Sequence, residues 1–133
     1  MIAGEDYAAV IFNFGSGATG IWDANRYNEC NFENPRYTFG ELLLDANEGS
    51  IRLYLDGRIT IQKLGEKERP HQYHHEDRAF SGDCCYTTQR HFIDRMLDSK
   101  PFETNGHEYL KTLAVQEAVY ESASKGTTIS VSL

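Results

Sequence analysis

Residues 101–133, PFETNGHEYLKTLAVQEAVYESASKGTTISVSL, predict a helix between a proline-containing loop and a terminal strand. The helix is expected to begin near Asn105 or His107, and apolar residues occupy nearly every side of it. Such a helix is buried between other elements, here between a sheet and a neighbouring helix. Gly126 predicts the C-cap, and the β-branched run at 127–133 predicts a last strand.

A second, amphipathic helix is expected before this stretch. The apolar residues that recur on one of its faces are Cys85, Phe92, Met96 and Leu97. Asp83 occupies the expected N-cap position, and Pro101 ends the helix because proline has no backbone N–H to donate.

The first two thirds of the chain predict strands and turns. The expected strands are residues 6–14, 19–27, 37–45, 50–55 and 58–63. Val10, Phe12 and Phe14 are expected on one face of the first strand, and Asp56-Gly57 predicts a two-residue hairpin. The polar, aperiodic residues 65–82 predict a loop.

We therefore expect residues 1–133 to form a single α+β domain. Its open, mainly antiparallel sheet of about six strands has the two helices of the C-terminal half packed on one face. Both faces of the strands carry apolar residues, as the consecutive Leu42, Leu43 and Leu44 indicate. Two helices cover only one face, so the other is expected to meet another domain or a second copy in a homo-oligomer.

Composition and charge exclude several classes of protein. The 13 basic and 20 acidic residues give a net charge of −7, which argues against nucleic acid as a partner. No apolar run approaches the roughly 20 residues of a membrane helix, and no secretory signal opens the chain. Three cysteines, two of them adjacent, favour a reducing, cytoplasmic location.

The segment Gly15-Ser16-Gly17-Ala18-Thr19-Gly20 matches the dinucleotide-binding pattern G-x-G-x-x-G. That function requires a helix directly after the last glycine, where the helix N-terminus receives the pyrophosphate. Residues 21–28 are poor in helix formers. A hairpin is therefore favoured, and no cofactor-binding residue is predicted in this chain.

Two other sets of residues carry ligand-binding chemistry. His71, His74 and His75 are metal-ligand types, but their spacing favours a solvated loop over a metal site. Arginine and tyrosine around a loop can hydrogen-bond sugar hydroxyls or the carboxylate of a sugar acid. The candidate substrate-binding residues are Asn25, Arg26, Tyr27, Arg36 and Tyr37. The alternative is that these residues shape the loop and pack.

The order of several short motifs resembles the C-terminal domain of the Gfo/Idh/MocA oxidoreductases, named for glucose–fructose oxidoreductase and inositol dehydrogenase. The motifs are Gly4-Glu5-Asp6-Tyr7, Phe14 to Ala18, Asn47 to Ile51, Phe80 to Pro101, and the helix ending Tyr120-Glu121-Ser122-Ala123. The resemblance implies a substrate-binding and oligomerisation domain of an oxidoreductase that acts on a sugar, polyol or sugar derivative. It also implies NAD or NADP as cofactor of the full-length protein.

The chain departs from that family in lacking the N-terminal dinucleotide fold, the catalytic lysine and the Asp/His motif. Residues 66–70, Glu-Lys-Glu-Arg-Pro, only faintly echo the lysine motif and receive no catalytic role. No catalytic residue is predicted, and the chain is expected to be an inactive piece of a longer dehydrogenase. The alternatives are a stand-alone, non-catalytic carbohydrate-binding or scaffold module and a small metalloenzyme centred on the histidines.

Overall fold

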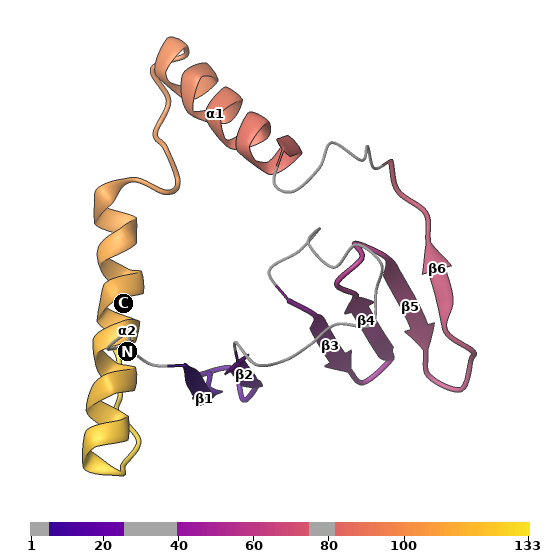
Figure 1. Cartoon of the computed structure of the whole chain (residues 1–133), viewed down its shortest axis with the longest axis horizontal. Coiled ribbons are helices and arrows are strands. Elements are labelled where there is room, and N and C mark those ends of the chain that lie inside the picture. Colours follow the sequence, from indigo (N-terminus) through magenta and orange to yellow (C-terminus); the bar gives the residue numbers. More distant parts are fainter. Residues whose placement is uncertain (1–5, 26–39, 75–81) are drawn as a thin grey trace. The chain divides into compact units, whose positions relative to one another are not determined.

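The computed structural model describes residues 6–25, 40–74 and 82–133 (Figure 1). The chain divides into two compact units, Met1–Asn28 with Arg95–Leu133, and Glu29–Asp94. The elements in the described ranges are β1 (Tyr7–Asn13), β2 (Thr19–Asn25), β3 (Leu42–Ala46), β4 (Gly49–Leu53), β5 (Ile59–Lys63), β6 (Arg69–His71), α1 (Gly82–Leu97) and α2 (Gly106–Lys125). The α+β class, the antiparallel pairing and the two helices in the C-terminal half are confirmed.

Strands β1 and β2 form an antiparallel hairpin that contains the G-x-G-x-x-G segment. Its turn is closed by a hydrogen bond from the Phe14 amide to the Ala18 carbonyl at 3.0 Å. Gly17 has a φ of 88°, which glycine adopts without steric cost. The segment runs directly into β2, so the hairpin prediction is confirmed. Val10 and Phe12 share one face of β1, as expected.

The other four strands form a separate antiparallel sheet in the order β3-β4-β5-β6. The six strands are therefore divided between two sheets rather than joined in one hydrogen-bonded sheet. Strand β6 lies where a loop was expected, and it pairs with β5 from Ile59↔His71 to Ile61↔Arg69. Pro70 fits this position because β6 ends the sheet, where a missing backbone donor is tolerated.

The register makes one face of this sheet apolar. Directly paired residues share a face, and the six aliphatic residues that do so are Leu42, Leu44, Ile51, Leu53, Ile59 and Ile61. The opposite face carries Leu43 beside polar residues, namely Asp45, Ser50, Arg52, Thr60 and Gln62. The expectation of two apolar faces is wrong for this sheet, because alternation sends only the middle leucine of the triplet to the second face.

Helix α2 has the ends that its sequence predicts. The Asn105 side chain accepts hydrogen bonds from the backbone amides of His107 at 2.9 Å and Glu108 at 3.2 Å. Gly126 ends the helix in the left-handed conformation, at a φ of 64°. Helix α1 begins at Gly82, so Asp83 lies in its first turn rather than at the N-cap.

The strand expected at residues 127–133 does not form with any strand of the described ranges. Instead the Thr127 carbonyl accepts a hydrogen bond from Ser122 Oγ at 2.7 Å. A β-branched run forms a strand only where a partner supplies the ladder. Neither helix in the described ranges has the length and apolar character that a membrane span requires.

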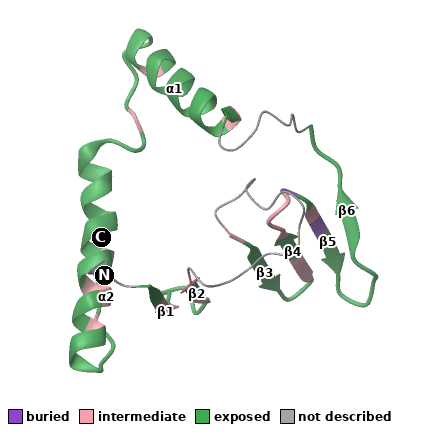
Figure 2. Cartoon of the chain, in the orientation of Figure 1, coloured by how far each residue is buried: buried purple, intermediate pink, exposed green. Residues whose placement is uncertain are grey.

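Few residues in the described ranges are buried (Figure 2). No hydrophobic residue there is fully buried, whereas Thr60, with 5% of its surface exposed, is. On the apolar face of the four-stranded sheet, Leu44 has 54% and Ile51 45% of its surface exposed. The packing of the helices on one face of the sheet concerns the arrangement of these parts and stays a prediction.

Candidate functional site

The candidate substrate-binding residues lie mostly outside the described ranges. Asn25 is the exception: it ends β2, pairs with Tyr7 and is half-buried. The others, Arg26, Tyr27, Arg36 and Tyr37, lie outside the described residues. Their role in binding a substrate therefore stays a prediction.

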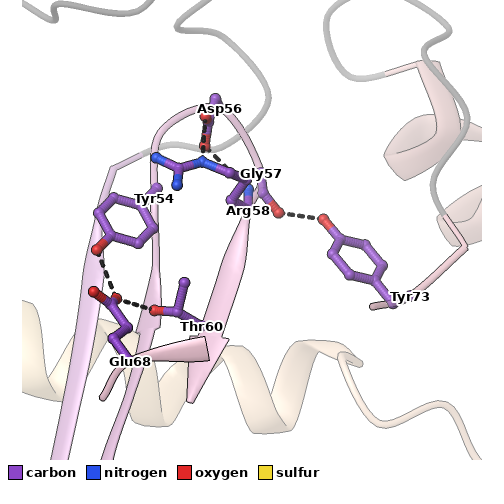
Figure 3. A network of polar contacts seen from close by, with 7 residues as sticks. All are labelled: Tyr54, Asp56, Gly57, Arg58, Thr60, Glu68 and Tyr73. Atoms are coloured by element: carbon purple, nitrogen blue, oxygen red, sulfur yellow. Dashed lines mark hydrogen bonds and ion pairs between the residues drawn. The ribbon is translucent and has the colours of Figure 1, made fainter. Parts of the chain in front are cut away.

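A network of polar contacts surrounds the turn between β4 and β5 (Figure 3). We call it the turn network; its members are Tyr54, Asp56, Gly57, Arg58, Thr60, Glu68 and Tyr73. The turn is closed by hydrogen bonds from the Tyr54 amide to the Arg58 carbonyl and from the Gly57 amide to the Tyr54 carbonyl, both 2.9 Å. Only Gly57 has a positive φ, at 84°. These bonds enclose the three residues Leu55, Asp56 and Gly57, so the hairpin at Asp56-Gly57 has a three-residue turn rather than the expected two-residue one.

Glu68 is the acceptor at one side of the turn network. Its Oε1 atom accepts a hydrogen bond from the Tyr54 hydroxyl at 2.8 Å and another from Thr60 Oγ1. The hydrogen bonds from Thr60 and Tyr54 lower the pKa of Glu68 below its ordinary value, since they stabilise the charged form. Glu68 is consequently ionised at neutral pH and accepts hydrogen bonds rather than donating a proton.

Asp56 and Arg58 form the other side of the turn network. Asp56 Oδ2 lies 2.8 Å from Arg58 Nε, and Asp56 Oδ1 accepts from the Arg58 amide at 3.1 Å. Partial burial acts to raise the pKa of Asp56, but the hydrogen bonds from Arg58 outweigh it and lower the pKa. The Arg58 guanidinium lies 4.5 Å from the centre of the Tyr54 ring, a cation–π contact. Tyr73 donates its hydroxyl hydrogen to the Gly57 carbonyl.

This arrangement has the chemistry of hydrogen bonding and not of proton transfer. Both carboxylates have lowered pKa values, so neither serves as a general acid near neutral pH. Sequence reasoning missed Tyr54, Thr60 and Glu68 because they converge only when β6 pairs with β5. The signal that was available is the short run Arg69-Pro70-His71, which can form a proline-containing edge strand.

The histidines do not converge on a metal site in the described part of the chain. His71 is in β6, His74 follows it, and His75 lies outside the described residues. Within residues 6–25, 40–74 and 82–133, no group of at least three histidine, cysteine, aspartate or glutamate residues is placed to hold a metal ion.

Comparison with known proteins finds relatives among sugar dehydrogenases. No protein-family model matches the chain. It is 30% identical to D-apiose dehydrogenase from Rhizobium rhizogenes over 145 aligned residues, which cover 98% of this chain and 39% of that enzyme. It is also 30% identical to D-apiose dehydrogenase from Paraburkholderia graminis, over 96% of this chain and 35% of that enzyme.

A solved structure shows the same similarity. This is an oxidoreductase from Agrobacterium radiobacter in complex with NAD+, L-tartaric acid and magnesium. It matches with a TM-score of 0.77 and 28% identity over 96% of this chain and 39% of that one. The chain thus spans less than two fifths of the length of these three proteins, and it is similar over nearly its whole length to their C-terminal region.

Proposed function

We propose that this chain is the C-terminal substrate-binding and oligomerisation domain of an NAD(P)-dependent oxidoreductase of the Gfo/Idh/MocA type. The proposed substrate is a sugar, polyol or sugar derivative. One observation carries the proposal: nearly all of the chain aligns with only 39% of D-apiose dehydrogenase. The larger remainder of such an enzyme is where the dinucleotide-binding fold and the catalytic lysine are expected.

The proposal assigns the cofactor to the remainder of the enzyme. A pyrophosphate-binding loop needs a glycine-rich turn that opens a helix. In this chain the glycine-rich segment opens β2 instead, so it offers no helix N-terminus to a cofactor. The Agrobacterium oxidoreductase, which carries NAD+, supports a nicotinamide cofactor for the full-length protein.

The proposed substrate class rests on the relatives and on the candidate residues together. One relative is a dehydrogenase of D-apiose, and the solved structure contains L-tartaric acid. Both are small molecules with several hydroxyl groups. Arg26 and Arg36 would supply fixed donors to hydroxyl or carboxylate oxygens, and Asn25, Tyr27 and Tyr37 further hydrogen bonds. The proposed partners are a second copy of the chain and the N-terminal domain of the same protein. The proposed location is the cytoplasm.

Calorimetric titration of this chain with NAD+ tests the proposal. We expect no heat of binding, because the chain contributes no pyrophosphate-binding loop. Binding of NAD+ with micromolar affinity to this chain alone would contradict the assignment of the cofactor to the other domain. Sedimentation velocity tests the oligomer separately, and a monomer at micromolar concentration would remove that part of the proposal.

A further inference from the structure

The hairpin of β5 and β6 carries several charged residues. Its basic residues, Lys63, Lys67 and Arg69, are all at odd positions, whereas Glu66 and Glu68 are at even positions. In the paired strands, alternate residues point to the same face, so Lys63 and Arg69 lie on the face that carries Ile61. Alternation thus places Lys63 and Arg69 on one side of the hairpin, while Lys67 belongs to the connecting turn.

A pocket of about 290 Å³ lies on this hairpin. Ile61 is among its lining residues, together with Lys63, Lys67, Arg69 and Glu66. The connecting loop is held by backbone and side-chain hydrogen bonds, from the Glu66 amide to the Lys63 carbonyl at 3.0 Å and from Gln62 Nε2 to the Glu66 carbonyl at 3.1 Å. Lys63 and Arg69 are thus held by the paired strands, and Lys67 by the hydrogen-bonded turn between them.

The charges that line this pocket are not balanced. Arg69 forms an ion pair with Glu66 at 3.1 Å. Lys63 and Lys67 make no ion pair with any residue of the described ranges. Three cations against one carboxylate leave a formal charge of +2 at the pocket, although the whole chain carries −7.

The remaining acid of the hairpin is directed away from the pocket. Glu68 lies on the opposite face, where Tyr54 and Thr60 both donate to its carboxylate (Figure 3). Two hydroxyl donors hold this carboxylate in the turn network, and within the described residues it forms no ion pair with Lys63 or Lys67. The residues that line the pocket therefore keep their excess of positive charge.

We propose that this pocket binds the dianionic phosphate group of a phosphate monoester. A phosphate monoester carries about −1.5 to −2 charges near pH 7, which matches the formal charge of the lining. Arginine offers paired donors to phosphate oxygens, and lysines bind phosphate as point charges. The inference does not depend on the proposed dehydrogenase role, since it rests only on the β5–β6 hairpin.

Titration of the isotope-labelled chain with inorganic phosphate, followed by NMR, tests this inference. We expect chemical-shift changes confined to residues 61–71, with a dissociation constant on the order of 1 mM. In the variant Lys63→Gln/Lys67→Gln the affinity should fall about tenfold, because two exposed cations each contribute a several-fold factor. Raising the salt to 0.5 M should weaken binding further, since exposed charges are screened.

The matched control is Lys111→Gln/Lys125→Gln, which removes the same charge from α2, where both lysines pair with glutamates. This control should bind phosphate as the original chain does. Equal weakening in the two double variants would overturn the inference, because it would show attraction by overall charge alone. Shift changes outside residues 61–71, or none at 50 mM phosphate, would overturn it as well.

Discussion

Thr60 donates its hydroxyl hydrogen to Glu68 from a position where only 5% of its own surface is exposed. Replacing it by valine, Thr60→Val, keeps the shape and removes the donor. We predict that the pKa of Glu68 rises toward its ordinary value, because the hydrogen bond to Thr60 is the largest cause of its lowering. Carbon-detected NMR titration of the Glu68 carboxyl measures this directly.

The sign of the accompanying stability change follows from linkage. The pKa of Glu68 is lower in the folded chain than in the unfolded chain. Its contribution to the free energy of unfolding is therefore fully present above its pKa in the unfolded chain, and it is lost as the pH falls through its pKa in the folded chain. The Thr60→Val variant should therefore have a lower free energy of unfolding than the original chain at neutral pH, and this difference should become smaller below about pH 4. Thr87→Val, which removes a hydroxyl from exposed α1, is the control and should leave the pKa of Glu68 unchanged. An unchanged pKa in Thr60→Val would contradict the turn network.

Gly49 is the second residue with a testable role. Its φ is 147°, and an added Cβ would lie 2.0 Å from the Gln62 carbonyl oxygen, a backbone atom of β5. We predict that Gly49→Ala lowers the free energy of unfolding by at least about 2 kcal/mol, measured by urea denaturation. Gly40→Ala is the control, since nothing lies within 4 Å of its added Cβ. Equal stability of the two variants would argue against the register of β4 and β5.

Single residues show which positions were predictable from the sequence. Val10 and Phe12 were placed correctly on one face because alternation along a strand is a local property. The run Leu42, Leu43 and Leu44 predicts two apolar faces, but the apolar character of the second face depends on residues from other strands. Those partners include Arg52 and Thr60, and only the register reveals them.

At the scale of elements, the N-terminus of α2 offers the sharpest prediction. Asn105→Ala removes the acceptor for the amides of His107 and Glu108. We expect a loss of about 1 kcal/mol in the free energy of unfolding, which thermal denaturation can measure. Asn105→Asp keeps an acceptor oxygen and should stay close to the original stability. A loss of the same size in both variants would show that the cap does not act through this acceptor.

Helix ends were predictable where a cap is encoded locally, as at Asn105 and Gly126. Short strands were not: β6 has only three residues and contains a proline, so its existence depends on pairing with β5. The prediction of a strand at residues 127–133 is wrong because a strand also needs a pairing partner. Its residues favour strand, but no described strand pairs with them.

At the scale of the whole molecule, the sequence led to the correct class and to relatives of the expected kind. The order of motifs from Tyr7 to Ala123 resembles a C-terminal oxidoreductase domain, and the chain is similar to sugar dehydrogenases over 96–98% of its length. The turn network could not be predicted, because Tyr54 follows β4, Thr60 is in β5 and Glu68 precedes β6. Of the predicted substrate residues, only Asn25 lies in the described ranges.

The amino-acid sequence encoded in frame immediately before Met1 tests the central claim most directly. Sequencing that region should reveal a strand, a glycine-rich turn and a helix of the dinucleotide-binding kind, followed by a catalytic lysine. Such a sequence would show that this chain is the C-terminal domain of a longer oxidoreductase. An in-frame stop codon directly upstream, or a preceding segment of unrelated fold, would contradict the claim.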